Sequence, residues 1–228
     1  MQNRRPNSRS LVNDENADAR VSAFFSISAI MTVVLMVVWV LAPPPTLGVE
    51  EGQMAPDIVG DGHSNGDWKN FRLHNHFNHT WEEGEPGQYI FLQFMDTDCG
   101  HCWQDALDMT EDYNSFGANG AVLFISVSVG MLQTEHSRGE IVAFQEQLQY
   151  TGCYQDENCA DRPGDPHPWV YVDDLNLKAF NQYSPPGVPF HLLLSPDGTV
   201  VWNSAQHPQG DPLHDATDAI GFHLSGGV

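Results

Sequence analysis

The chain places a Cys-Gly-His-Cys motif at residues 99–102, directly after an apolar run at 89–95. That run, Tyr-Ile-Phe-Leu-Gln-Phe-Met, has the length and composition of a buried β-strand. The residues that follow, 99–116, are predicted to form a helix. A helix that begins at Cys99 brings the two sulfur atoms together across one turn. The pattern therefore favours an α/β fold in which a buried strand delivers a cysteine pair to a helix N-terminus.

The start of a helix favours a thiolate at Cys99, because unpaired backbone N–H groups and the helix dipole stabilise negative charge there. We expect Cys99 to be the exposed, attacking thiol and Cys102 the buried, resolving thiol. His101 adds positive charge, which further favours the thiolate and makes the pair more oxidising. Four acidic side chains oppose this effect by raising the thiol pKa: Asp96, Asp98, Asp105 and Asp108.

Two other interpretations of the motif are weaker. Half of a zinc site would need completion by histidines, since the chain has no second C-x-x-C, and a strand-to-helix position does not suit a zinc knuckle. An inert structural disulfide is disfavoured because so close a pair at a helix start is readily reduced. The candidate histidines are His74, His76 and His79, which could also bind a metal by themselves. A polar loop insertion is the simpler interpretation, and we predict no metal site.

The remaining pattern predicts a mixed central sheet covered by helices. A Ser-Pro-Asp-Gly turn at 195–198 is a strong hairpin signal between two short strands. Residues 60–66 read as a glycine-rich turn, 74–88 as polar turns and 150–168 as a loop. Further strands are predicted at 67–73, 121–129, 169–172, 190–194 and 199–202, and helices at 140–149, 177–182 and 213–222.

A second functional marker is Gly187-Val188-Pro189, just before the strand at 190–194. A trans proline is awkward at the entrance to a buried strand, so we predict a cis Val188–Pro189 bond. That bond would present the Val188 backbone to a substrate chain beside Cys99, with Gly100 as a further contact. The signal is weak alone and becomes strong together with the C-x-x-C motif and the terminal hairpin.

Residues 21–42 carry no charge and follow a basic stub. About 20 apolar residues cross the hydrocarbon core as a helix, and positive charge on the N-terminal side predicts an N-inside orientation. A cleaved signal peptide is the alternative, although the run exceeds a typical h-region and no clean cleavage site follows it. The four arginines of the stub are Arg4, Arg5, Arg9 and Arg20.

The chain is strongly acidic, and its negative charge lies in the part after residue 42. The whole chain has 30 acidic and nine basic residues, and residues 43–228 hold 27 and five of them, a net charge of −22. Such a balance excludes nucleic-acid binding. The absence of a D-x-D-x-D-G loop leaves a strongly solvated surface as the preferred interpretation. We predict five segments: a cytoplasmic stub (1–20), a transmembrane helix (21–42), a linker (43–53), one domain (54–206) and a C-terminal tail (207–228).

Residues 50–205 resemble the thioredoxin fold, specifically the membrane-anchored TlpA/ResA-like and redoxin branch. The resemblance rests on the Ala-Pro-Asp entry at 55–57, the strand leading into C-G-H-C, an acid three residues after the second cysteine, the Gly-Val-Pro loop and the S-P-D-G-T-V-V-W hairpin. The C-G-H-C motif is itself similar to the active site of protein disulfide isomerases.

The resemblance implies roles for single residues. Cys99 attacks, Cys102 resolves and Pro189 positions the substrate. Asp105 stands where many TlpA-like proteins have a glutamate that relays protons, although it could also be a solvated acid on the helix face. Gln93 stands where thioredoxins carry a buried aspartate, and the residues before the motif also depart from the family pattern, which leaves the redox potential and partner open.

Cys153 and Cys159 are predicted to form a loop disulfide, which would persist outside the cytoplasm and stabilise the fold by about 2–3 kcal/mol. A second redox relay that exchanges electrons with the motif is the alternative. Asn78-His79-Thr80 also fits the acceptor pattern for N-glycosylation. The glycosylation pattern is relevant only if the domain is exported.

These observations predict an extracytoplasmic, membrane-anchored thiol–disulfide oxidoreductase that needs no cofactor. Its partners would be cysteines of exported proteins, a membrane or extracytoplasmic electron donor or acceptor, and the lipid bilayer through residues 21–42. A peroxiredoxin-like peroxidase is one alternative, but Thr97 precedes Cys99 by two residues instead of the three of T-x-x-C. A copper metallochaperone that uses Cys99, Cys102 and a histidine is another.

Overall fold

The computed structural model describes residues 24–34, 46–132 and 136–227. The chain divides into two compact units, Met1–Pro44 and Pro45–Val228. Of the predicted membrane span, residues 24–34 form a helix with exposed side chains, and the remainder lies outside the described residues, as does the basic stub. Within the described parts of the chain, no helix combines the length and the apolar character needed to cross a bilayer.

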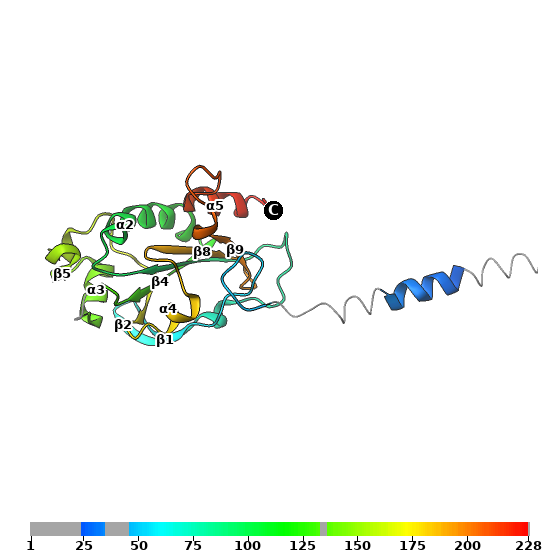
Figure 1. Cartoon of the computed structure of the whole chain (residues 1–228), viewed down its shortest axis with the longest axis horizontal. Helices are drawn as coiled ribbons and strands as arrows, with labels where there is room; N and C mark the ends of the chain where they lie inside the picture. Colours follow the sequence, from blue (N-terminus) through cyan, green and yellow to red (C-terminus); the bar gives the residue numbers. More distant parts are fainter. Residues whose placement is uncertain (1–23, 35–45, 133–135, 228) are drawn as a thin grey trace, which may run out of the picture. The chain divides into compact units, whose positions relative to one another are not determined.

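The second unit is built on a seven-stranded mixed sheet in the order β2-β1-β7-β4-β3-β8-β9. Figure 1 shows β8 and β9 on one side of β4 and β1 and β2 on the other. The pairs β3–β4 and β4–β7 are parallel, and the other neighbouring pairs are antiparallel. The strands are β1 Val59–Ser64, β2 Asp67–Arg72, β3 Tyr89–Met95, β4 Val122–Val129, β7 Val170–Asp174, β8 Phe190–Leu194 and β9 Val200–Asn203.

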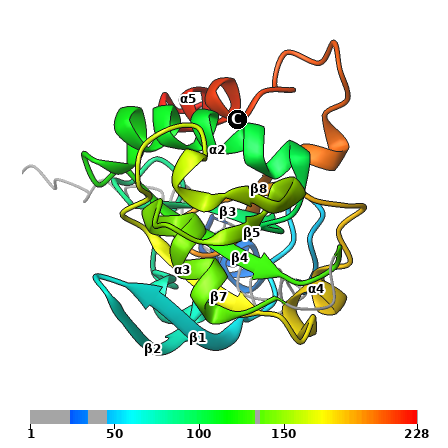
Figure 2. The same ribbon diagram turned by 90° about the vertical axis from the view of Figure 1, so that its left-hand side faces the viewer.

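Helices cover both faces of this sheet, because β3 and β4 lie at its centre and bury side chains on each face. α2 Gly100–Asp112, α3 Arg138–Glu146 and α5 Ala216–Leu224 pack against one face, with Phe91 and Met95 of β3. α4 Lys178–Tyr183 packs against the other, with Phe94. Figure 2 shows α2 and α5 along the same side of the sheet. The predicted α/β thioredoxin-like architecture, a mixed sheet flanked by helices, is therefore confirmed.

The predicted glycine-rich turn at 60–66 is wrong, because residues 59–64 form strand β1. β1 pairs with both β2 and β7, so its backbone groups find hydrogen-bond partners although the strand has few apolar side chains. A Cβ at Gly62 would lie 2.7 Å from Val170 Cγ2, so the glycine allows the strands to approach closely. The turn is confined to Asn65-Gly66, whose φ angles of 52° and 78° suit a tight hairpin.

The ends of the domain also differ from the prediction. Residues 46–53 are folded onto the domain and not a free spacer, since Gly48 N–H donates to Met54 O and Asn203 Nδ2 donates to Val49 O. In the predicted tail, α5 buries Ala219 and Ile220 in the core next to the sheet. The folded unit therefore extends on both sides of residues 54–206.

The loop at 150–168 has structure of its own. It contains a two-stranded hairpin, β5 Thr151–Cys153 and β6 Glu157–Asn158, followed by the short 3-10 turn η4 Cys159–Asp161. Helix α3 ends earlier than predicted, because Gln147 adopts a left-handed conformation that turns the chain toward this loop.

Candidate active site

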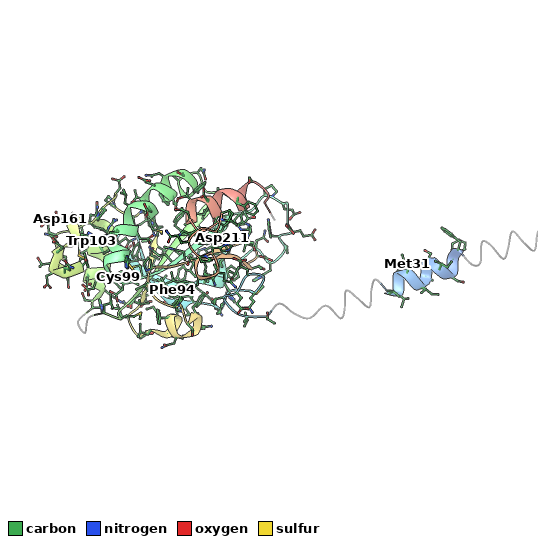
Figure 3. The ribbon with its side chains drawn as sticks, turned by 45° about the horizontal axis from the view of Figure 1, so that its top comes forward. Met31, Phe94, Cys99, Trp103, Asp161 and Asp211 are labelled. Carbon is green, nitrogen blue, oxygen red and sulfur yellow. A yellow bond between two sulfur atoms is a disulfide. The ribbon has the colours of Figure 1, made fainter. Side chains whose placement is uncertain are left out.

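The cysteine pair lies where β3 passes into α2. Cys99 is the N-cap residue of α2, with an extended backbone, and its Sγ accepts a hydrogen bond from Cys102 N–H at 3.3 Å. Both cysteines are free thiols. The predicted helix-start position of the motif is thus confirmed. Figure 3 shows Cys99 and Trp103 at the end of the domain that also carries Asp161.

Cys99 is not the exposed thiol that the sequence predicts, since only 5% of its surface is accessible. Two segments from elsewhere in the chain lie against Cys99 and its neighbours. The Val188 carbonyl oxygen lies 3.4 Å from Cys99 Sγ, and Tyr154 N–H donates to Thr97 O. A Cβ at Gly100 would lie 2.7 Å from the Tyr154 ring, so the glycine is needed for this covering contact.

The predicted cis bond between Val188 and Pro189 is present. It lies in the segment that precedes β8, and both residues are partly exposed. The Val188 backbone therefore stands directly beside the Cys99 sulfur, as the sequence predicts for a substrate contact.

Hydrogen bonds lower the pKa of Cys99 to about 6. The largest cause is the hydrogen bond with the Cys102 side chain; burial opposes it, and the backbone N–H groups of Cys102 and His101 add to it. The Asp96 charge also opposes ionisation but does not prevail. Burial and the neighbouring Cys99 raise the pKa of Cys102 far above its usual range. The two thiols are therefore strongly differentiated, and Cys99 is the more acidic of them. The His101 side chain is exposed.

This difference predicts the pH dependence of alkylation. Below pH 6 the reaction of Cys99 with iodoacetamide should slow about tenfold per pH unit, since only the thiolate reacts, and above pH 7 it should be constant. The alkylation rate of an ordinary cysteine, whose pKa is about 8.5, would instead keep rising up to about pH 8.5. Mass spectrometry of the alkylated peptides between pH 4.5 and 9 measures both cysteines. A midpoint for Cys99 near 8.5 would contradict the assignment.

Asp105 belongs to a hydrogen-bonded network and is not a solvated acid on the helix face. Gln93 Nε2 donates to Asp105 Oδ2 at 2.6 Å, and His191 Nε2 lies 3.0 Å from the same oxygen. Gln93 and His191 are opposite each other in β3 and β8. Ser126 Oγ in turn donates to Gln93 Oε1. Burial lowers the pKa of His191, but Asp105 together with Asp112 and Asp108 outweighs burial, so the pKa lies above its usual value. Asp105 also raises the pKa of Cys102.

His191 was missed by sequence reasoning, although strand alternation in 190–194 places it on the face opposite Leu192. A cavity of about 390 Å³ opens beside Asp105 and His191 and is also lined by Asp108, Asp112 and residues of the C-terminal segment. Burial raises the pKa of Asp112 to about 6. Asp105 therefore borders a cavity that is lined mainly by polar and acidic residues.

A second acidic group surrounds the turn before Cys99. Asp96 accepts hydrogen bonds from the N–H groups of Asp98, Met131 and Leu132 at 2.8–3.1 Å. Thr97 Oγ1 donates to Glu140 on α3. Burial, followed by the Glu140 charge, raises the pKa of Asp98 to about 6. Asp96 and Asp98 were identified from the sequence, but Glu140 was not. It lies far from Cys99 in the chain, and an acidic residue in a helix is by itself no sign of a site.

In the described residues, the three histidines at 74–79 do not gather into a group of metal ligands. His74 Nε2 contacts Ala55 O at 3.0 Å, and His76 stacks on Phe71. Within residues 24–34, 46–132 and 136–227, one group of at least three potential ligands lies within metal-binding distance, and it contains neither these histidines nor the free cysteines. Among the described residues, no histidine joins Cys99 and Cys102 in such a group.

Cys153 and Cys159 form the predicted disulfide, and both are fully buried. The bond closes the loop that carries Tyr154 over the start of α2. Because Tyr154 follows Cys153 directly and lies against Gly100, the disulfide belongs to the surroundings of the candidate site.

No protein-family model and no curated protein sequence matches the chain. Among solved structures it is similar to a reduced 2-Cys peroxiredoxin from Plasmodium vivax, with 15% identity over 80% of this chain and 85% of that chain, at a TM-score of 0.51. A mitochondrial 2-Cys peroxiredoxin from Plasmodium falciparum matches with 13% identity over 79% and 98%, also at 0.51. A putative thiol:disulfide interchange protein DsbE from Chlorobium tepidum matches with 18% identity over 68% and 85%, at 0.48. At such identities the similarity concerns the fold alone.

Proposed function

We propose that the chain is an extracytoplasmic, membrane-anchored thiol–disulfide oxidoreductase that acts on cysteines of exported proteins. The observation that carries the proposal is the cysteine pair itself. Two reduced thiols stand one helical turn apart, and the Cys102 N–H points at Cys99 Sγ from the start of α2. This arrangement favours a thiolate on one sulfur and holds the second sulfur within reach of it.

The chemistry is disulfide exchange. The Cys99 thiolate attacks a substrate disulfide, so that a bond forms between Cys99 and one substrate sulfur while the other leaves as a thiolate and takes up a proton. Cys102 then loses its proton and attacks Cys99 Sγ, which releases the second substrate thiol and leaves a Cys99–Cys102 disulfide. The reverse sequence oxidises a substrate dithiol. A membrane or extracytoplasmic thiol donor or acceptor resets the pair.

Asp105 is the proton acceptor for Cys102 in this proposal. Its carboxylate is held by Gln93 and His191 and borders a cavity. The raised pKa of Cys102 makes such a base necessary, because the thiol does not ionise unaided at neutral pH.

The substrate chain would bind beside Val188. The carbonyl of Val188 already faces Cys99 Sγ, so an extended substrate segment can pair with this backbone and bring its sulfur to Cys99. Gly100 and Pro189 complete the contact surface. A substrate can reach Cys99 only if the segment that carries Tyr154 moves away, since Cys99 is buried in the structure.

The location is argued from the sequence. The 22 uncharged residues at 21–42 follow four arginines, which favours an anchor with the cysteine domain on the far side of the membrane. The high negative charge of the exported part suits a soluble domain that stays off anionic lipid.

The experiment is trapping with Cys102→Ser. Wild-type chain should accelerate the reduction of insulin disulfides by dithiothreitol, and the variant should accumulate a mixed disulfide at Cys99, because the resolving thiol is gone. Mass spectrometry after alkylation identifies the adduct. A peroxide-consumption assay runs in parallel. Rapid peroxide turnover without any trapped disulfide would replace the proposal by a peroxidase.

A further inference from the structure

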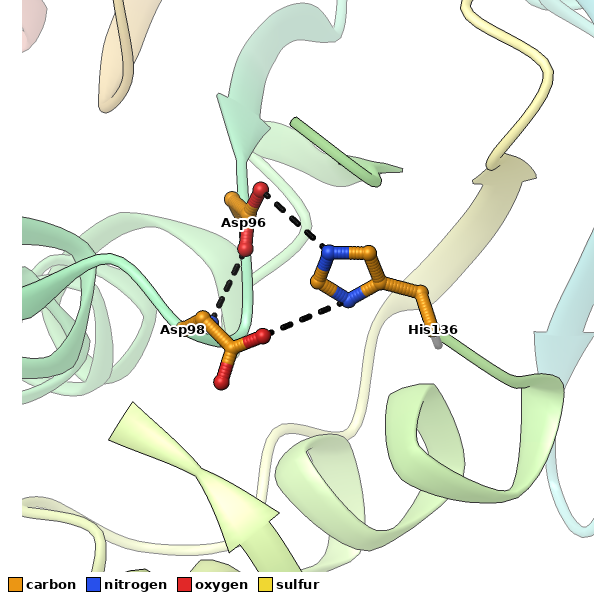
Figure 4. Close-up of side chains that lie close together, drawn as sticks. All are labelled: Asp96, Asp98 and His136. Atoms are coloured by element: carbon orange, nitrogen blue, oxygen red, sulfur yellow. Dashed lines mark hydrogen bonds and ion pairs between the residues drawn. The ribbon is translucent and has the colours of Figure 1, made fainter. Parts of the chain in front are cut away.

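The turn before Cys99 meets the start of α3 in a buried cluster of four ionisable side chains: Asp96, Asp98, His136 and Glu140. Asp96, Asp98 and Glu140 are 0%, 9% and 3% exposed, and the His136 side chain is 6% exposed. Figure 4 shows the His136 ring between Asp96 and Asp98. None of these four side chains takes part in the disulfide exchange proposed above, although the Asp96 charge opposes ionisation of Cys99.

His136 faces Asp96 through one ring nitrogen and faces Asp98 and Glu140 through the other, so an ion would bind only one of the two nitrogens. His136 Nε2 lies 3.8 Å from Asp96 Oδ2, and His136 Nδ1 lies 3.6 Å from Asp98 Oδ2 and 3.5 Å from Glu140 Oε1. One ligand atom from each of Asp96, Asp98 and His136 lies within 4.8 Å of the others. Ligand atoms about 2.0–2.2 Å from a tetrahedral zinc ion stand roughly 3.4 Å apart.

The charge of the cluster calls for a cation. Three buried carboxylates face one imidazole, and no lysine or arginine of the described residues forms an ion pair with any of them. Asp96 accepts three backbone hydrogen bonds, but Asp98 Oδ1 is buried with no hydrogen-bond partner. Burying a charged carboxylate costs free energy of folding unless the group is paired or coordinates a metal.

We propose that Asp96, Asp98 and His136 bind one divalent transition-metal ion, with Glu140 as an adjacent carboxylate. Two carboxylate oxygens and one imidazole nitrogen suit Zn²⁺ or Mn²⁺, whereas Cu⁺ prefers thiolates. The ion would tie the end of β3, and with it the turn that carries Cys99, to the residue that precedes the N-cap of α3. The site goes beyond disulfide exchange and does not depend on it.

The test is calorimetric titration of the chelator-treated, reduced full chain with MnCl₂ and, separately, ZnCl₂. Wild type should bind one equivalent, and Asp98→Asn and His136→Gln should each weaken binding at least tenfold. A Cys99→Ser/Cys102→Ser double variant should bind like wild type, which separates this site from thiol binding. Asp112→Asn, a buried acid outside the cluster, is the matched control and should also bind normally.

Thermal unfolding supplies an independent readout. Saturating metal should raise the Tm of wild type, since a ligand that binds only the folded chain stabilises it, and should leave the Tm of Asp98→Asn unchanged. Circular dichroism of each metal-free variant verifies that it is folded. If one variant is not folded, the other variant and the wild-type stoichiometry test the proposed site. The proposal is overturned if wild type shows no saturable equivalent, if both cluster variants bind normally, or if only the cysteine variant loses binding.

Discussion

Cys99→Ser should reduce insulin disulfides no faster than dithiothreitol alone. The hydroxyl of serine is not ionised at neutral pH, so the hydrogen bonds that lower the pKa of the Cys99 thiol have no thiolate to stabilise. No other sulfur can replace it, because Cys102 is 1% exposed and its pKa is raised far above the usual range. The measurement is the initial rate of insulin precipitation, with the wild type and a chain-free reaction alongside.

The control for this result is a Cys153→Ser/Cys159→Ser double variant. If the second disulfide is structural, the variant loses stability but keeps most of its activity at a temperature where it is folded, in line with the few kcal/mol that such a bond contributes. If the bond is a redox relay, its loss stops turnover as completely as loss of Cys99. Full activity in Cys99→Ser would refute the assignment of the nucleophile.

The sequence predicted those parts of the site that are local in the chain. The strand at 89–95, the helix start at Cys99 and the Val188–Pro189 bond depend on short-range patterns of hydrophobicity, spacing and proline chemistry. Strand β1 was not predicted, because its stability comes from pairing with β2 and β7 and not from its own side chains. An Asn-Gly pair at 65–66 was the available signal.

The contacts that cover and tune the site are long-range and were not predictable in the same way. Tyr154 reaches Gly100 across 54 positions only because the loop folds back over α2. His191 meets Asp105 through the register of β3 and β8, which no local pattern encodes. Exposure of Cys99 was therefore mispredicted, even though its position at the helix start was correct.

The covering loop depends on a buried arginine. Arg162 is 2% exposed, and no carboxylate of the described residues pairs with it. Its guanidinium instead donates to the carbonyl oxygens of Phe144, Pro163 and Asp165 at 2.7–2.8 Å and lies 2.8 Å from His167 Nε2. Burial lowers the pKa of Arg162, and burial together with the Arg162 charge keeps the pKa of His167 well below its usual value. The guanidinium thus fastens the loop to the end of α3.

Arg162→Ala should lower the free energy of unfolding by about 3–4 kcal/mol, because three buried carbonyls lose their charged donor at once. Arg138→Ala is the matched control. Arg138 forms ion pairs with Asp61 and Asp173, but its side chain is 47% exposed, so its loss should cost no more than about 1 kcal/mol. Urea unfolding of both variants measures the difference. Equal losses in the two variants would contradict a larger contribution of the buried guanidinium to stability.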